Sequence, residues 1–476
     1  MRNIFQSNIN TPFFIFIATG LFFLPGLYSQ SQSPNIILIM TDDQGWGDTG
    51  YNGHPHLKTP NLDAMVSNGI EFTRFYAASA VCSPTRGSVI TGRHPMRYGI
   101  CYANCGHILQ EEVTMAEMVK DEGYTTGHFG KWHLGTLTRS DLDANRGGRP
   151  ENDKHYSPPW ENGFDECFVT ESKVPTWDPM VTPPIQSGGV NKSQVEGGYY
   201  GTAYWKGPGE KACDNLGGDD SRVIMDRVIP FIDRAVEKEK PFLSVIWFHT
   251  PHLPVLTGQE YRDMYSSLSE DEQHYYGCIS AMDDQVGRLR NHLRELGIEK
   301  NTVLFFTSDN GPEGKSSDEG RTRGRTKGLS GRKRSLHEGG IRVPGIMEWP
   351  GQVEPGKVDF PCFTSDYFPT IAGIIGIDIG KFNRPYDGQN LIEMLAGTNT
   401  ERYLAFRIED QAAIIRDRYK IYSDDNGGTF SLYDLLEDPG EEKDLSKEKD
   451  ELFSNLVSSW EKWKLSQERS ATGADY

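Results

Sequence analysis

Three continuous apolar runs, each followed at once by polar residues, constrain the fold of this chain more than any other feature. The runs span residues 35–40, 241–248 and 302–306. A run of this length without alternation is typical of a parallel strand that is buried on both faces. The polar residues after each run then lie at the carboxyl ends of the strands, where open α/β sheets bind their ligands. The pattern therefore predicts an α/β fold with a site at those strand ends.

Oxygen-bearing side chains follow two of these runs. Asp42 and Asp43 come after the first run, and Asp309 and Asn310 come after the third. A ligand set made only of oxygens selects hard cations, Ca²⁺ or Mg²⁺, rather than zinc. Adjacent aspartates also form simple capping turns, which is the structural alternative for the first pair. The sequence thus predicts a metal site that joins two strand ends.

A cysteine–proline–arginine motif lies between the first and second runs, within residues 80–88. Pro84 suits the first turn of a helix, and Ser83 is a suitable N-cap. Cys82 would then lie at the positive end of the helix dipole, and Arg86 would grip an oxyanion through two N–H groups. This arrangement favours a nucleophile that acts on sulfate or phosphate esters. A buried or capping cysteine is the structural alternative.

The motif at Cys82, followed by Thr-Gly-Arg at residues 91–93, resembles the signature of the type I, formylglycine-dependent sulfatases. Residues 130–135 (GKWHLG), 338–344 (EGGIRVP) and 432–435 (LYDL) match further family segments, so the resemblance covers nearly the whole mature chain. It implies an alkaline-phosphatase-like α/β/α sandwich with a large mixed sheet. A small C-terminal α+β domain with an antiparallel sheet is expected to follow.

The resemblance also implies the chemistry of the site. In this family the motif cysteine, here Cys82, is oxidised to Cα-formylglycine, and the hydrated aldehyde attacks sulfur while Asp309 assists deprotonation of the attacking hydroxyl. His252 and Lys333 are expected to bind sulfate, and one of them to protonate the leaving oxygen. His133 is expected to take a proton from the remaining hydroxyl, so that sulfate leaves and the aldehyde reforms.

The remaining roles follow from the same resemblance. Arg86 and Lys131 are expected to stabilise the charged diol, and His252 is preferred to His249 as the family's functional histidine. Lys333 lies between two arginines where the family often has glycine. The expected catalytic residues are Cys82, Arg86, Lys131, His133, His252 and Lys333, and the expected ligands of one Ca²⁺ are Asp42, Asp43, Cys82, Asp309 and Asn310.

Charge restricts the partners of the protein. The 476 residues carry a formal net charge of −18, which argues against nucleic acid as a partner because phosphate binding needs a basic face. Residues 315–334 nevertheless contain eight lysines and arginines. This basic segment is either a solvated loop or a surface that attracts a polyanion. Together with an aromatic-rich loop over residues 136–220, it favours a sulfated carbohydrate substrate, such as the algal glycans ulvan or carrageenan.

The N-terminal segment is typical of a secretory signal. Its apolar stretch, residues 12–27, is shorter than the ~20 residues that span a bilayer, so cleavage is favoured over anchoring. We expect a signal peptide (1–31), a catalytic domain (32–396) and a C-terminal subdomain (397–476). The protein is expected to be exported, periplasmic or secreted, without a stable membrane span. Besides Cys82, six cysteines remain, an even number that permits disulfides without fixing their pairing.

The sequence therefore predicts an exported, Ca²⁺-dependent sulfatase that a formylglycine-generating enzyme matures. Two alternatives remain open. A phosphodiesterase or phosphonate monoester hydrolase of the same superfamily shares the cysteine motif, and comparing sulfate with phosphate esters separates it from a sulfatase. A non-catalytic glycan-binding relative is disfavoured because every expected catalytic position is occupied.

Overall fold

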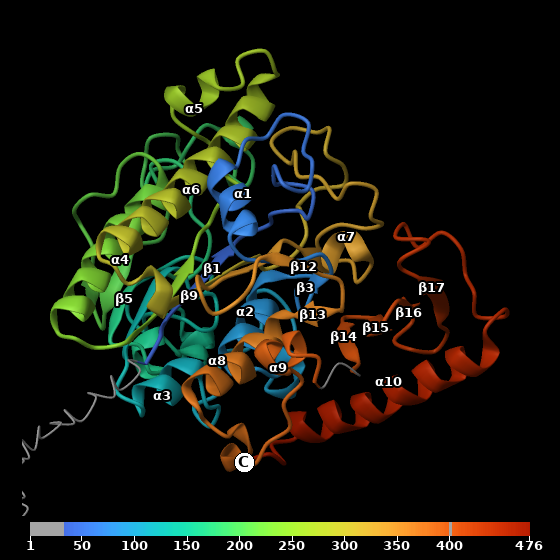
Figure 1. Cartoon of the computed structure of the whole chain (residues 1–476). Helices are drawn as coiled ribbons and strands as arrows, with labels where there is room; N and C mark the ends of the chain where they lie inside the picture. Colours follow the sequence, from blue (N-terminus) through green and yellow to red (C-terminus); the bar gives the residue numbers. More distant parts are fainter. Residues whose placement is uncertain (1–32, 399–401) are drawn as a thin grey trace, which may run out of the picture. The chain divides into compact units, whose positions relative to one another are not determined.

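The computed structural model describes residues 33–398 and 402–476 (Figure 1). The expected signal peptide, residues 1–31, lies outside the described residues. Within the described part of the chain, no helix combines the length and the apolar character that a membrane crossing requires.

The three apolar runs form the centre of the main sheet, as predicted. Strand β1 (Asn35–Thr41) lies between β8 (Phe242–Trp247) and β9 (Thr302–Ser308), and all three run parallel. In the described part of the chain this mixed sheet has ten strands, in the order β12-β2-β11-β9-β1-β8-β4-β5-β6-β7. The outer strands are β2 (Ile70–Phe72), β4 (Thr125–Lys131), β5 (Glu166–Thr170), β6 (Trp205–Gly207), β7 (Glu210–Lys211), β11 (Gly345–Glu348) and β12 (Gly356–Val358).

Helices cover both faces of the sheet because successive side chains of a strand point to opposite faces. Ile37 and Ile39 of β1 belong to a core with α1 (Pro60–Ser67), α4 (Asp220–Glu237) and α6 (Glu270–Glu295). The alternate residues of β1 face a second core with helices that lie on the other side of the sheet (Figure 1). These helices are α2 (Cys82–Thr91), α3 (Met115–Lys120) and α8 (Tyr367–Ile375).

The layers confirm the predicted α/β/α sandwich. Helix α6 begins at Glu270, where Ser269 and Glu272 form a capping box before the first apolar residue. The shorter elements are β3 (Phe75–Tyr76), β10 (Arg342–Val343), β13 (Cys362–Phe363), α5 (Gln259–Asp263), α7 (Glu338–Ile341), α9 (Leu391–Leu395) and the 3₁₀ turns η1 (Pro95–Arg97), η2 (Pro150–His155), η3 (Pro159–Glu161), η4 (Ile185–Ser187), η5 (Glu299–Asn301), η6 (Thr364–Asp366) and η7 (Ile379–Phe382).

The C-terminal region contains the predicted small antiparallel sheet. One face of this sheet packs on Tyr76 and Leu336, and the other packs on Trp460 of helix α10 (Asp450–Ala471). Figure 1 shows α10 beside these strands. Within residues 402–476 the strands are β14 (Leu404–Ile408), β15 (Gln411–Arg416), β16 (Tyr419–Ser423) and β17 (Ser431–Asp434).

Asp387 ties helix α10 to the rest of the protein. Its carboxylate accepts two hydrogen bonds from Arg97, each 2.8 Å long, and one of 2.8 Å from the indole Nε1 of Trp463 in α10. The backbone N–H of His94 donates a further bond of 2.6 Å. Burial alone would raise the pKa of Asp387, but Arg97 and the other donors lower it to about 2.

The variant Asp387→Asn is expected to lower the free energy of unfolding by about 3 kcal/mol at neutral pH, because buried Arg97 loses its carboxylate. A carboxyl whose folded pKa is lowered contributes stability that is present above about pH 4 and is lost as the pH falls toward 2. The difference between the two proteins, measured by urea unfolding, should therefore shrink between pH 5 and pH 3. The variant of an exposed aspartate, Asp359→Asn, should match the parent at both pH values. A difference that does not depend on pH would contradict this account.

Candidate active site

The ends of β1 and β9 meet, because the two strands are parallel and Thr41 pairs with Ser308. The backbone N–H of Asp43 donates to Asp309 Oδ1 over 3.1 Å, and Asn310 Nδ2 donates to Asp43 Oδ1 over 2.8 Å. Asp43 adopts φ of 68°, in the left-handed region, which turns the chain sharply at the strand end. The carboxylates predicted from separate runs are thus close together and buried.

Helix α2 brings Cys82 to this edge of the sheet. The expectation that Ser83 caps the helix is wrong: α2 begins at Cys82, and extended Val81 occupies the N-cap position. The turn is held instead by Thr85, whose hydroxyl donates to Ser79 O and accepts from Ser79 N. Cys82 still lies in the positive first turn, 2% exposed, and burial raises the pKa of its thiol. An unmodified Cys82 is therefore a weak nucleophile, because the thiolate is the reactive form.

Each of the three aspartates holds one buried basic side chain. Burying a charge is costly unless an opposite charge compensates it, so these pairs fix the positions of the cations. Although burial alone would lower the pKa of Lys333, the neighbouring carboxylates raise it, and its ammonium remains charged. The pairs are Arg86 with Asp309 (2.6 Å), Lys131 with Asp42 (2.7 Å) and Lys333 with Asp43 (2.6 Å).

The pKa values of Asp42 and Asp309 are shifted in opposite directions. Burial, followed by the charge of Asp42, raises the pKa of Asp309 to about 7. Burial would also raise the pKa of Asp42, but Lys131, His252 and other cations lower it well below its usual value. Two neighbouring carboxyls with pKa values far apart are typical of sites that move protons.

His133 contacts the cysteine directly. Its Nδ1 lies 3.3 Å from Cys82 Sγ, and its Nε2 lies 2.9 Å from the side-chain oxygen of Asn104. Because that oxygen only accepts, Nε2 carries the hydrogen and Nδ1 presents a lone pair to Cys82. Asn104 belongs to a loop that the Cys101–Cys105 disulfide closes. Burial lowers the pKa of His133 well below its usual value.

The two candidate histidines after β8 have different surroundings. His249 is fully buried, and its ring nitrogens bind Asp220 and Thr170, each at 2.8 Å. His252 lines the pocket over Cys82, with Nδ1 bonded to a backbone carbonyl and Nε2 3.6 Å from Asp43 Oδ2. Burial lowers the pKa of His252 to about 4. His252 is thus the histidine that faces the site.

A pocket of about 420 Å³ opens over Cys82. All the expected catalytic residues except Arg86 line it, and Arg86 lies buried behind Asp309. Its other polar lining residues were not predicted from the sequence, although Asn104 lies in the short Cys101–Cys105 interval and Glu313 lies just beyond Asn310. These residues are Tyr102, Asn104, Asn145, Ser172, Lys173, Glu313, Thr322 and Arg334.

The strand ends fit a hard cation. Asp42, Cys82 and Asp309 each offer a ligand atom, and these atoms all lie within 4.8 Å of one another. Asp42 Oδ1 and the side-chain oxygen of Asn310 are buried and have no hydrogen-bond partner among the described residues. Buried oxygens without a donor are costly unless a cation or another donor compensates them.

A second cleft continues from the pocket over Cys82. It has a volume of about 570 Å³ and shares Asn145, Ser172, Lys173 and Gly189 with that pocket. Tyr199 lines the cleft with 62% of its surface exposed. A ligand bound at Cys82 can therefore extend past Lys173 along a wall that carries an aromatic side chain.

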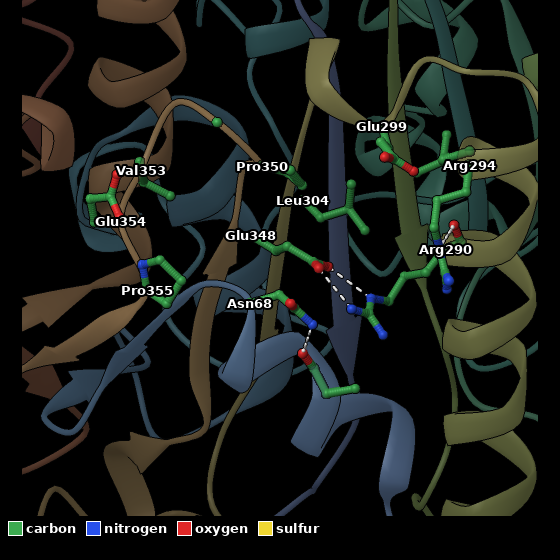
Figure 2. Close-up of a pocket in the computed structure, with 13 residues that line it drawn as sticks. Asn68, Arg290, Arg294, Glu299, Leu304, Glu348, Pro350, Val353, Glu354 and Pro355 are labelled. Carbon is green, nitrogen blue, oxygen red and sulfur yellow. Dashed lines mark hydrogen bonds and ion pairs between the residues drawn. The ribbon is translucent and has the colours of Figure 1, made fainter.

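A separate hollow of about 480 Å³ lies at the amino end of β9, the opposite end from Asp309 (Figure 2). Figure 2 shows Arg290 and Glu348 joined across it, and their shortest contact is 2.7 Å. Its described lining contains neither cysteine nor histidine. The reactive groups are therefore concentrated at the carboxyl ends of the strands, as the sequence predicts.

Comparisons with known proteins agree with this geometry. The family model described as Sulfatase matches residues 34–377. Human steryl-sulfatase is 30% identical over 433 residues, which cover 79% of this chain and 72% of that protein. N-acetylgalactosamine-6-sulfatase of Sus scrofa is 32% identical over 399 residues, which cover 79% and 69%.

Among solved structures, that of Ps i-CgsB in complex with k-i-k-neocarrahexaose superposes with a TM-score of 0.76 at 26% identity. The match covers 92% of this chain and 94% of that one. The motifs, the sheet that carries them and the family match over most of the sequence show that this chain belongs to the sulfatase family, as a sulfuric ester hydrolase with the alkaline-phosphatase-like fold.

Proposed function

We propose that this protein removes sulfate from a sulfated oligosaccharide or polysaccharide, using a formylglycine derived from Cys82 and one Ca²⁺ ion. The observation that carries the substrate class is the cleft beside the pocket over Cys82, which gives a chain-like substrate room beyond the reacting group. Conversion of Cys82 would supply a hydrated aldehyde as the nucleophile. Ca²⁺, held by the oxygens of Asp42, Asp43, Asp309 and Asn310, would neutralise the charge of a bound sulfate.

The basic side chains around the pocket are suited to hold the sulfate ester. Lys131, Lys333 and His252 approach from different elements and surround the space in front of Cys82. A sulfate monoester carries a charged group that repels nucleophiles, so these cations favour attack at sulfur. We assign protonation of the departing ester oxygen to His252 or Lys333, so that the alcohol leaves with its proton.

We assign two groups to move protons at position 82. Asp309, which offers a carboxylate oxygen within 4.8 Å of Cys82 Sγ, is assigned as the acceptor of the proton from the attacking hydroxyl. His133 Nδ1, which presents its lone pair to position 82, is assigned to take the later proton as sulfate departs. Arg86 holds Asp309 through two hydrogen bonds and is assigned to fix its orientation.

The names of the relatives support a sugar substrate but do not identify the sugar. One is named an N-acetylgalactosamine-6-sulfatase, and the Ps i-CgsB structure contains a neocarrahexaose, whereas another relative is named a steryl-sulfatase. A panel of sulfated algal oligosaccharides, a small aryl sulfate and matching phosphate esters tests the proposal. Sulfate release from an oligosaccharide is expected, and a preference for phosphate esters would favour the phosphodiesterase alternative instead.

Loss of the aromatic ring of Tyr199 from the second cleft should affect long substrates and not small ones. The variant Tyr199→Ala is expected to raise KM for the oligosaccharide about fivefold, because an exposed ring that stacks on a sugar contributes about 1 kcal/mol. Turnover of a small aryl sulfate, which does not reach the cleft, should be unchanged. Tyr403→Ala is the matched control, because Tyr403 is also exposed and lies outside both clefts. Equal effects on the two substrates would argue against oligosaccharide binding in this cleft.

We also propose that the protein is exported and that a formylglycine-generating enzyme converts Cys82. The Cys101–Cys105 disulfide supports export, since disulfides persist in oxidising compartments. The leader-like segment at residues 1–31 agrees with this proposal. N-terminal sequencing of the protein recovered from outside the cytoplasm of its host, with a start near residue 32, is the expected result.

A further inference from the structure

Some cations of the basic segment, residues 315–334, form ion pairs with neighbouring carboxylates. Arg321 contacts Asp271 at 3.3 Å, and Arg334 binds Glu313 at 2.7 Å, so carboxylates already compensate these two cations. Lys333 pairs with Asp43 at 2.6 Å, and Arg323 lies 3.9 Å from Asp271, but three other cations of the segment have no such partner. Arg325, Lys327 and Arg332 lie beyond ion-pair distance from every carboxylate in the described residues, and all three line one pocket.

This pocket has a volume of about 270 Å³ and lies between the segment after β1 and the basic segment. The other side chains that line it are His54, Pro55, Ser317 and Thr326, and within residues 33–398 and 402–476 no carboxylate lines it. That composition is unusual for a protein whose formal net charge is −18. Uncompensated cations in one concave surface attract and concentrate anions.

Several hydrogen-bond donors of the pocket remain unused or bind only neutral groups. His54 Nδ1 accepts bonds from two backbone N–H groups, so the neutral ring carries its hydrogen at Nε2. That Nε2 and the Nε of Arg325 are buried without a partner among the described residues. Lys327 and Arg332 donate to backbone carbonyls and form no ion pair with a described carboxylate, although Asp48 and Glu313 act on the charge of Arg332 from a greater distance.

We propose that this pocket is a second binding site for a sulfate-type oxyanion, separate from the pocket over Cys82. A tetrahedral oxyanion offers several acceptors and a negative charge, which the guanidinium, ammonium and imidazole donors match. The basic segment lines both sites, because Lys333 faces Cys82 and the preceding Arg332 faces the second pocket. The anion is either another sulfate group of a multiply sulfated substrate, which rests on the proposed function, or free inorganic sulfate, which does not.

The double variant Arg325→Gln/Lys327→Gln tests the site. Its matched control is Lys315→Gln/Arg323→Gln, which removes the same charge from the same segment outside both pockets. If the anion belongs to the substrate, the test variant should raise KM for a multiply sulfated oligosaccharide about tenfold, the effect of losing one to two charge-assisted contacts. KM for a singly sulfated aryl ester should be unchanged, and the control variant should resemble the parent.

Calorimetric titration of the full chain with inorganic sulfate tests the second possibility, that the anion is free sulfate. Loss of one sulfate-binding event in the test variant, and not in the control, would identify free sulfate as the ligand. The inference is overturned if the test variant matches the control in both KM and sulfate binding. Lys327→Gln alone, at an exposed position, provides a second variant if the double variant melts early. If the parent turns over no sulfate ester, the proposed function fails, while the titration still decides whether the pocket binds sulfate.

Discussion

Replacing Cys82 with alanine is expected to reduce sulfate-ester turnover by about 10⁴-fold or more, because it removes the group from which the nucleophile is made. The thiol itself does not account for activity, since burial raises its pKa and keeps it protonated. The fold should survive, because Cys82 contributes a small side chain to the start of α2 and the helix is held by Thr85. Turnover of an aryl sulfate and the melting temperature measure the two effects.

Cys213→Ala is the matched control, because Cys213 is another free cysteine and is exposed. It should behave like the parent in both measurements. Peptide mass spectrometry on parent protein produced with a formylglycine-generating enzyme should show a loss of ~18 Da at Cys82, the change from thiol to aldehyde. Turnover by Cys82→Ala that remains near the parent level would overturn the proposed chemistry. An unmodified Cys82 in fully active protein would leave the family assignment intact but require a different nucleophile.

Removal of the metal should produce the second large effect. Dialysis against a chelator is expected to lower turnover by about 10³-fold and also to lower the melting temperature, and Ca²⁺ should restore both. The physical reason is the gathering of Asp42, Asp43 and Asp309, together with buried oxygens that lack donors. A ligand that binds only the folded state at about 100 times its Kd stabilises that state by about 3 kcal/mol.

Measurement of the melting temperature tests metal binding independently of catalysis. The variant Asp309→Asn should lose most of the stabilisation by Ca²⁺, whereas Asp318→Asn, at an exposed position of the basic segment, should retain it. Both variants remove one carboxylate, so a general effect of charge would change them equally. A melting temperature that is insensitive to the chelator would contradict the metal site. Restoration by Mg²⁺ and not by Ca²⁺ would contradict the choice of metal.

The sequence alone predicted the central part of the fold and the groups at its edge. The runs at residues 35–40, 241–248 and 302–306 are apolar throughout because their strands are buried on both faces, and the structure places them side by side. The carboxylates that follow had to meet, since parallel strands end at the same edge of a sheet. Local sequence patterns indicate which strands are buried and in which direction they run, so the central strands and the groups at their ends could be inferred from the sequence.

The helix start near Cys82 was predicted less accurately. Local capping rules favoured Ser83, but Val81 is the N-cap, because the Thr85 hydroxyl bonds both backbone groups of Ser79 and fixes the turn. Cap choice depends on how the preceding chain approaches the helix, and here that chain is buried in the core that contains Tyr76, Ala78 and Val81. The functional conclusion does not change, since Cys82 lies in the first turn in either case.

Only the tertiary structure determined which side chains act together. Arg86 binds Asp309, 223 positions away in the sequence, a pairing that the sequence did not predict. Asn104 orients His133 from a loop that a disulfide closes, and no sequence pattern identified that pairing. Such contacts join residues that lie far apart in the sequence, and no repeating sequence pattern predicts which of them meet. Their geometry is set by the packing of whole elements, which also forms the pocket over Cys82 and the cleft beside it.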